Sequence, residues 1–483
     1  MPEYKVPGTR HGSEGMTRST PYDIAARLDR LPSSRTVWVI VMLLSLGSVF
    51  EFYDLFFAAY VAPGMVQTGL FTPGSLGIFG ALKVIRVAGF GTFVFSTFAG
   101  LWFGVVLLAQ ASDRFGRRAV FTWSLIWYIT CTAIMAFQAT GQSLNIWRFV
   151  AGVGFGVQLV TIDTYIVELV PRRLRGRAFC LNQLISFAIV PVVALLAWRL
   201  VPLQPFGLDG WRWVVLLGSV GAVVVWELRS GIPESPRWLA SRGRADEAAA
   251  IVGELERRIA AERGQVLAAP ALVPPPPEHS PHTALGEIFA PRYRSRTIML
   301  SGFNAAQVIG FYGFNSWVPT LLMARGINVT HGLEYAFIIA LAQPVGPLLG
   351  CMFADTLERK FQIMGGLACM AVSMAIFAVV TSPAALILLG IAFTLAANVM
   401  SYAYHGYQAE LFPTRIRSRA IGFVYSWSRL TAAFSGLIVG LLLARGGVPA
   451  VAMFIGGAMI VGIALIGALG PATNGLALEQ LND

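Results

Sequence analysis

The sequence predicts an all-α membrane protein with twelve transmembrane helices in two pseudo-symmetric halves of six. Three observations support this prediction. Of 483 residues, 56% are hydrophobic and only 13% are charged, and the mean hydropathy is +0.66, unlike the composition of soluble domains. Apolar stretches of about 20 residues, long enough to cross the hydrocarbon core of a bilayer, recur along the chain. Finally, a charged motif at the end of one apolar stretch is repeated much later.

Each apolar stretch is expected to be a helix, because a helix satisfies its backbone hydrogen bonds internally and the stretches are too long for barrel strands. The expected spans are 36–62, 88–110, 119–138, 146–168, 179–200, 212–231, 296–322, 333–354, 362–380, 384–409, 420–443 and 448–470. The residues before the first span are polar and lack the apolar core of a cleaved signal peptide. We therefore expect the first span to be retained.

The spans and the polar segments between them define five expected domains. These are a cytoplasmic tail (1–35), a six-helix half (36–231), a linker with helical and proline-rich parts (232–295), a second half (296–470) and a C-terminal cytoplasmic tail (471–483). Most of the 36 Lys and Arg residues lie in the tails and in loops on the side of the linker. This places that side in the cytoplasm of a plasma-membrane protein. The net charge of +11 thus orients the chain and does not predict nucleic-acid binding.

The charged motif shows that the two halves are related. The chain reads "ELVPRRLRGRA" from Glu168 and "ELFPTRIRSRA" from Glu410, and "SDRFGRR" around Asp113 corresponds to "ADTLERK" around Asp355. Both pairs of motifs are separated by the same number of residues. We infer a parallel duplication of six helices, in which a binding site lies near mid-membrane between the halves.

Several motifs, taken in their order, resemble the major facilitator superfamily along the whole chain. They are "DRFGRR" after span two, "RFVAGVGFG" in span four, "ELVPRRLRGR" after it, "PESPRWL" after span six and "ELFPTRIRSR" after span ten. "PESPRWL" and "FYD" are similar to the sugar porter branch, whereas "YAYHGYQAELFPT" in span ten is more similar to the organic-acid and metabolite:proton symporters. Span seven keeps Gly313 and Asn315 of the sugar porter pattern but has Ile309 and Gly310 where that branch has paired glutamines. The resemblance implies a monomeric transporter.

Charged residues at the cytoplasmic helix ends form a predicted gate. Glu168 and Glu410 end spans four and ten, and each is followed by a proline and several arginines. In the family such residues close the cytoplasmic side in the outward-open state, and the resemblance implies the same here. The predicted gate residues are Asp113, Arg117, Arg118, Glu168, Arg175, Asp355, Arg359, Glu410 and Arg417. The alternative is that the arginines only set topology and contact lipid headgroups.

Charged side chains inside the spans predict proton coupling. Each costs at least about 2.5–3.5 kcal/mol to insert, so a function is the default interpretation. Glu51 and Asp54 lie three residues apart near one face of span one, and Arg148 enters span four to a similar depth. Separating the pair would let the carboxylate take up a proton. The predicted proton-coupling residues are Asp54, Glu51, Arg148 and Asp163, and the alternative is a static ion pair.

Arg429 is the predicted centre of substrate binding, because it lies about 15 Å into span eleven and needs a carboxylate partner there. That partner is either an anionic substrate or an internal acid such as Asp163. The other predicted pocket residues are Gln158, Gln183, Asn304, Gln307, Asn315, Trp317, Asn398, Tyr404 and His405. Each could instead form an interhelical hydrogen bond, although Gln183 and Asn315 match sugar porter binding positions.

The predicted function is proton-coupled symport of a small organic metabolite, an organic or aromatic carboxylate, by alternating access. A sugar or polyol:proton symporter, a drug exporter and a non-transporting receptor are the alternatives. No metalloprotease motif, phosphate-binding loop or set of nucleophile and base is recognisable, so we expect no enzyme activity, cofactor or metal. The glycines of "GVGFG" (152–156) predict close helix packing and not a nucleotide loop. The expected partners are the substrate, protons and the lipid bilayer.

Overall fold

The N-terminal half contains six long helices, which match the first six predicted spans. The computed structural model describes residues 21–71, 89–228, 232–265, 267–270, 285–353 and 357–473. The six helices are α2 (Arg35–Gln67), α3 (Gly91–Phe115), α4 (Arg117–Ala136), α5 (Gly141–Leu169), α6 (Arg175–Leu200) and α7 (Gly210–Leu228). Side-chain caps mark helix starts: Ser34 accepts a hydrogen bond from the Val37 amide at 3.3 Å and Thr140 accepts one from Ser143 at 3.2 Å.

The C-terminal half contains the remaining six spans, of which two are broken and two are joined in one helix. Its helices are α10 (Pro291–Asn315), α11 (Val318–Ala324), α12 (Val329–Ala340), α13 (Val345–Phe353), α14 (Arg359–Phe377), α15 (Pro383–Glu410) and α16 (Thr414–Leu469). The predicted spans 296–322 and 333–354 each consist of two helical pieces and not of one continuous helix. Each span is broken in two, and a proline near each break, Pro319 or Pro344, cannot donate a helical hydrogen bond.

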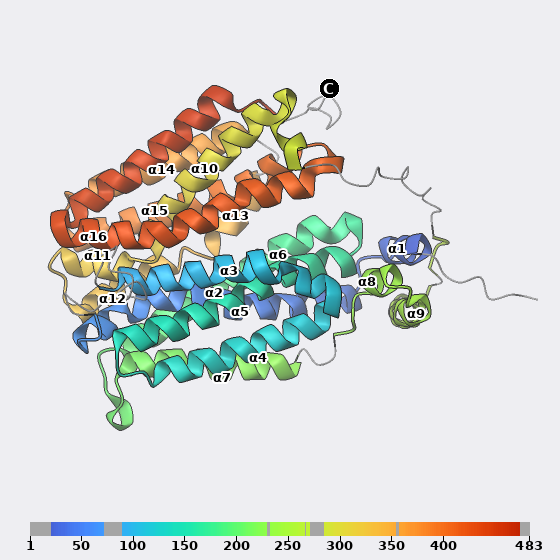
Figure 1. The fold of residues 1–483 in the computed structure, drawn as a ribbon, viewed down its shortest axis with the longest axis horizontal. Helices are drawn as coiled ribbons and strands as arrows, with labels where there is room; N and C mark the ends of the chain where they lie inside the picture. The colour runs from blue at the N-terminus through green and yellow to red at the C-terminus, as the bar shows by residue number, and fades with distance from the viewer. Residues whose placement is uncertain are drawn as a thin grey trace, which may run out of the picture.

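Spans eleven and twelve are the two arms of α16. The helix doubles back on itself (Figure 1), and its backbone leaves the helical region at Gly447, where φ is 63° and ψ is −162°. Glycine adopts this left-handed φ without the steric cost that a side chain would add. Pro449, two residues later, further restricts the backbone at the turn.

Helix length and composition agree with a membrane protein. Among the described residues, seven helical segments are long and apolar enough to cross a membrane, including the segment that holds both arms of α16. The shorter apolar segments Gly91–Val106 and Gly210–Val224 lie in α3 and α7. The fold is that of twelve transmembrane helices in two six-helix halves.

Three further helices lie together at one end of the bundle, which we call the linker end (Figure 1). They are α1 (Pro21–Asp29), α8 (Pro236–Ser241) and α9 (Ala245–Arg263). Glu256 of α9 binds Arg27 at 2.7 Å and Arg30 at 2.6 Å, which attaches the linker to the segment before α2. The N-terminal tail before residue 21, most of the proline-rich part of the linker and the last ten residues lie outside the described residues.

Small residues allow α3 and α5 to pack closely. A Cβ atom added at Gly100 would lie 2.2 Å from the carbonyl oxygen of Phe149, and one at Gly156 would lie 2.3 Å from that of Leu101. These neighbours are backbone atoms, which cannot move aside as a flexible side chain could. The prediction that the "GVGFG" glycines serve helix packing is therefore confirmed.

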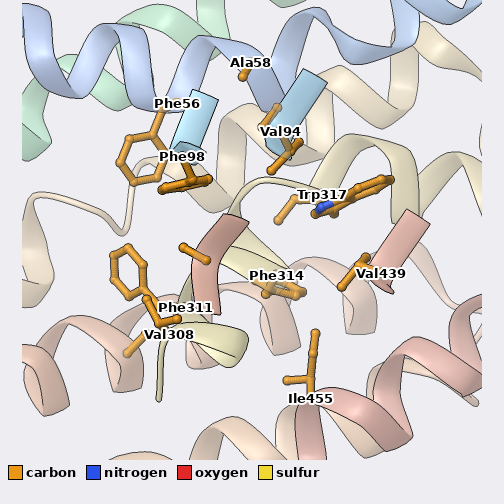
Figure 2. Packing of buried hydrophobic residues seen from close by; sticks show 14 of the residues in the cluster. Phe56, Ala58, Val94, Phe98, Val308, Phe311, Phe314, Trp317, Val439 and Ile455 are labelled. Carbon is orange, nitrogen blue, oxygen red and sulfur yellow. The ribbon is translucent and has the colours of Figure 1, made fainter. Parts of the chain in front are cut away.

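The two halves meet in an apolar cluster toward the end opposite the linker helices, which we call the far end. Figure 2 shows Phe56 and Phe98 of the N-terminal half facing residues of α10 and α16. Aromatic pairs join the halves here: ring centres are 5.4 Å apart for Phe90 and Trp317 and 5.7 Å apart for Trp198 and Phe337. The far end of the interface is thus filled by well-packed apolar side chains.

Candidate functional site

Asp54 of α2 and Arg148 of α5 form an ion pair inside the N-terminal half. Arg148 Nη1 lies 2.6 Å from Asp54 Oδ1, and Arg148 Nη2 donates to the Asp54 carbonyl oxygen at 3.0 Å. The Arg148 and Asp54 side chains are 0% and 1% exposed, respectively. Charges buried to this extent persist only when each has close partners. The structure thus brings together the two residues that the sequence analysis expected to meet.

The Arg148 guanidinium has additional partners that the sequence analysis missed. Its Nε donates to Thr97 Oγ1 at 2.7 Å. Its central carbon lies 4.8 Å from the ring centre of Phe57 and 5.2 Å from that of Phe93, within the range of cation–π attraction. Nothing in the apolar spans that contain these residues distinguishes them from ordinary packing residues. Together they hold the guanidinium from the sides that Asp54 does not occupy.

The two oxygens of the Asp54 carboxylate differ in their hydrogen bonding. Tyr128 of α4 donates its hydroxyl hydrogen to Oδ1 at 2.8 Å, whereas Oδ2 is buried and has no hydrogen-bond partner among the described residues. Glu51 lies about one turn away on the same helix and is 4% exposed. The fourth predicted proton-coupling residue, Asp163, has its side chain outside the described part of the chain. Asp54 therefore has one oxygen in position to accept a proton without losing an existing contact.

Arg429 of α16 lies in the C-terminal half and is 7% exposed. It donates to the hydroxyl of Tyr312 at 3.2 Å and to that of Tyr425 at 3.1 Å, and its guanidinium lies 5.0 Å from the Tyr425 ring centre. Tyr312 in turn packs against Phe98 of the other half, with ring centres 4.6 Å apart. Arg429 was expected from sequence to bind a carboxylate, and neither tyrosine was predicted as its partner. A guanidinium oriented among aromatic rings suits a planar carboxylate.

A buried chain of amides links both broken spans to α15. Gln343, between α12 and α13, donates to Asn315 Oδ1 at 2.9 Å and accepts from Asn398 Nδ2 at 2.9 Å. Asn315 Nδ2 donates to the Phe311 carbonyl oxygen at 2.9 Å. Asn315 and Asn398 were predicted as pocket residues from sequence, whereas Gln343 was not. Both polar ends of the Asn315 amide therefore have partners within the protein.

Tyr404 and Asn304 form another buried polar group. The Tyr404 hydroxyl lies 2.5 Å from Asn304 Oδ1 and 2.6 Å from Gln408 Oε1. His405 Nδ1 lies 2.6 Å from the Ser401 carbonyl oxygen on its own helix. Tyr404 and His405 lie next to one another, with ring centres 5.0 Å apart. The contact between Asn304 and Tyr404 connects α10 to α15.

The contacts among the described residues do not bring the remaining predicted pocket residues together into one site. Gln158 and Gln307 are buried on α5 and α10, and Gln183 is half-buried on α6. Trp317 lies in the break between α10 and α11 and packs against Phe90 at the far end. We therefore place Trp317 in the interface between the halves.

At the linker end of the N-terminal half, Arg117 and Glu168 form the predicted charge pair. Arg117 Nη2 lies 2.8 Å from Glu168 Oε1 and Nε lies 3.2 Å from both carboxylate oxygens. Glu234 of the "PESPRWL" motif accepts from the backbone amides of Arg117 and Arg118 at 3.0 and 3.2 Å. Arg237 of the same motif donates to the Glu168 carbonyl oxygen at 3.0 Å. The roles of Glu234 and Arg237 were missed from sequence.

The C-terminal half repeats the arrangement, because Arg359 of α14 pairs with Glu410 of α15. Both charge pairs thus join helices of a single half. Arg175 donates to the Val170 carbonyl oxygen at 3.1 Å and lies 3.8 Å from Asp29. Of the other predicted gate residues, the following have side chains outside the described residues: Asp113, Asp355 and Arg417. No group of three His, Cys, Asp or Glu side chains in the described residues could hold a metal ion.

Comparisons with known proteins agree with this architecture. A family model described as "Sugar (and other) transporter" matches residues 40–483. The chain is 28% identical to the putative metabolite transport protein YyaJ of Bacillus subtilis, over 94% of this chain and 97% of the relative. It is 27% identical to the niacin transporter NiaP of Acinetobacter baylyi, over 95% and 99%. The partially occluded inward-open structure of the Escherichia coli xylose transporter XylE has a TM-score of 0.72 at 19% identity, covering 92% of this chain and all of that one.

Proposed function

Because the chain belongs to the sugar (and other) transporter family of the major facilitator superfamily, we propose that it is a proton-coupled symporter of a small organic carboxylate. Proteins of this family are transporters and not enzymes. The observation that carries the proposal is the buried pair of Asp54 and Arg148, in which one carboxylate oxygen has no hydrogen-bond partner among the described residues. We further propose that the transporter is monomeric, resides in the plasma membrane and has its linker end in the cytoplasm.

The ion pair supports proton coupling through the cost of burying charge. While both residues are charged, separating them would leave two uncompensated charges in a dry environment. A proton on Asp54 removes one charge, and the Arg148 guanidinium keeps Thr97 and the two phenylalanine rings as partners. Protonation thus lowers the barrier to rearranging α2 and α5, which couples proton uptake to the change of access.

Arg429 supports an anionic substrate. A carboxylate can accept two parallel hydrogen bonds from a guanidinium, and the Tyr312 and Tyr425 hydroxyls beside Arg429 help to orient the guanidinium for such a ligand. The transport of niacin by NiaP, a relative that matches along nearly its whole length, agrees with a small aromatic acid.

A sugar is the second candidate, because the family model and the XylE fold favour it. Against it, Ile309 and Gly310 offer no polar side chains where sugar porters have paired glutamines, and the Asn315 amide is engaged by Gln343 and Phe311.

The aromatic contacts between the halves support alternating access. Phe90 with Trp317 and Trp198 with Phe337 join the halves toward the far end. We propose that this structure represents a state closed at the far end. Opening it would require these apolar contacts to separate while the two halves approach one another at the linker end.

The test is uptake into proteoliposomes, with nicotinate, benzoate and xylose as probes and with or without an inward proton gradient. We expect gradient-driven accumulation of an acid but not of xylose. Asp54→Asn should abolish accumulation and retain exchange of the acid across the membrane, and Arg429→Gln should reduce binding of the acid. Accumulation that does not depend on the proton gradient, or that persists in the Asp54→Asn variant, would refute proton coupling. Accumulation of xylose alone would refute the carboxylate substrate.

A further inference from the structure

The two oxygens of the Asp54 carboxylate are distinguished by Tyr128. We propose that Asp54 Oδ2 is the atom that receives the proton, and that Tyr128 is the positioning residue that directs the proton there by occupying Oδ1. This inference rests on the proposed proton coupling and assigns its atoms. Oδ1 lies 2.6 Å from Arg148 Nη1 and 2.8 Å from the Tyr128 hydroxyl, whereas Oδ2 is buried without a hydrogen-bond partner in the part of the chain that the structure describes.

The chemistry of a hydroxyl donor explains why Tyr128 can do this in both protonation states. When Asp54 is charged, its Oδ1 accepts hydrogen bonds from Tyr128 and Arg148. When a proton from the aqueous side forms an O–H bond at Oδ2, Oδ1 becomes the carbonyl oxygen of a neutral acid, which still accepts from a phenol. No other bond breaks in this step. Tyr128 therefore keeps the carboxyl in place when Arg148 withdraws.

The surroundings make this arrangement rigid. Tyr128 is 3% exposed on α4, and Asp54 and Arg148 are 1% and 0% exposed on α2 and α5. Three helices therefore meet at one carboxyl group. A buried, charged carboxylate oxygen without a donor is unfavourable, and adding a proton to Oδ2 removes the negative charge. Adding the proton to Oδ1 would instead displace an existing hydrogen bond.

Tyr53, the residue that precedes Asp54, provides a matched control for Tyr128. It is 4% exposed, and its hydroxyl donates to the Val214 carbonyl oxygen at 2.6 Å instead of to the ion pair. Tyr53→Phe and Tyr128→Phe therefore each remove one buried phenol hydrogen bond and retain the ring. Only the second variant removes a hydrogen bond to Asp54.

Infrared difference spectra between neutral and acidic pH test the assignment without any substrate. The carbonyl stretching band that Asp54→Asn removes is the band of protonated Asp54. A hydrogen bond to a carbonyl oxygen lowers its stretching frequency, so Tyr128→Phe should move this band to higher frequency and Tyr53→Phe should leave it in place. A 3-fluorotyrosine incorporated at position 128, a stronger donor of similar shape, should move it to lower frequency. The proposal would be overturned if neither Tyr128→Phe nor 3-fluorotyrosine at position 128 moved this band.

Transport measurements test the role of Tyr128 in coupling. With the acid that the wild type accumulates as probe, Tyr128→Phe should reduce gradient-driven uptake about tenfold, which corresponds to about 1.4 kcal/mol, close to the lower limit for one hydrogen bond to a charged group. Exchange of the acid should change by less than about threefold. Equal losses in both measurements would show a merely structural role. If the wild type accumulates none of the probes, the proposed function fails, while the infrared band still decides which oxygen binds the proton.

Discussion

Glu234 should stabilise the linker end of the N-terminal half by capping α4. Its Oε1 accepts from the amides of Arg117 at 3.0 Å, Arg118 at 3.2 Å and Ser235 at 2.9 Å. The N-terminal amides of a helix have no partner within the helix. Glu234→Ala removes the acceptor for all three amides and also the negative charge at the helix N-terminus.

The expected cost follows from these two losses. Losing a side-chain cap costs about 0.5–2 kcal/mol, and losing a favourable charge at a helix N-terminus costs about 0.3–1 kcal/mol. Glu234→Ala should therefore lower the free energy of unfolding by about 1–3 kcal/mol. Glu234→Gln keeps an acceptor oxygen and should lose only the charge contribution, about 0.3–1 kcal/mol.

A nearby glycine offers an independent perturbation of the same cap. Gly116 has a φ of 98°, and a Cβ atom added there would lie 2.5 Å from Glu234 Oε2. Gly116→Ala should therefore destabilise the protein through both backbone strain and displacement of the carboxylate. Combined with Glu234→Ala, it should cost less than the sum of the two single changes, because the two residues are in contact.

The assay is reversible unfolding of the purified protein in mixed micelles, followed by circular dichroism. Glu254→Ala is the matched control, because it removes an exposed carboxylate of α9 that forms salt bridges with the exposed side chains of Arg257 and Arg258. We expect no measurable change for this control. A loss in Glu234→Ala no larger than in Glu254→Ala would refute the capping argument.

Three further predictions concern packing, the amide chain and the linker. Gly100→Val should lower stability by about 1–3 kcal/mol or more, because its Cβ would meet backbone atoms of α5, as thermal unfolding would show. Gln343→Leu should cost about 1–3 kcal/mol in the same assay by leaving buried amides without partners. For Glu256, burial raises the pKa but hydrogen bonds from Arg27 and Arg30 outweigh it and lower the pKa. The folded pKa lies below the ordinary value of 4.5, so the attachment of α1 should be strongest above pH 4.5 and weaken as the pH falls through the folded pKa, as hydrogen exchange of residues 21–29 would report.

Each of these predictions has a control in the same chain. Gly422→Val adds a side chain where nothing in the described structure lies within 4 Å of the Cβ position, so its stability should be unchanged. Gln138→Leu removes a partly buried bond to the Ile134 carbonyl oxygen and should cost less than Gln343→Leu. Glu256→Gln should weaken the attachment of α1 already at neutral pH. Equal behaviour of a variant and its control would contradict the corresponding prediction.

The amino-acid sequence by itself determined the fold class and the family. Burying twelve apolar stretches in a bilayer leaves a helical bundle as the solution, because backbone groups must be satisfied within each segment. The duplicated charged motifs around Glu168 and Glu410 predicted the two halves. Asp54, Arg148 and Arg429 could be selected because a charged residue inside an apolar span is costly and therefore conspicuous.

Only the tertiary structure decided which neutral residues surround these charges. Tyr128, Thr97 and Gln343 look like ordinary members of apolar spans, since a hydroxyl or amide costs little to insert and carries no sequence signal of its partner. The contact between Tyr128 and Asp54 spans α4 and α2, and that between Gln343 and Asn315 joins two helix breaks. Such contacts depend on how separate helices rotate and tilt against one another, which a local sequence pattern does not specify.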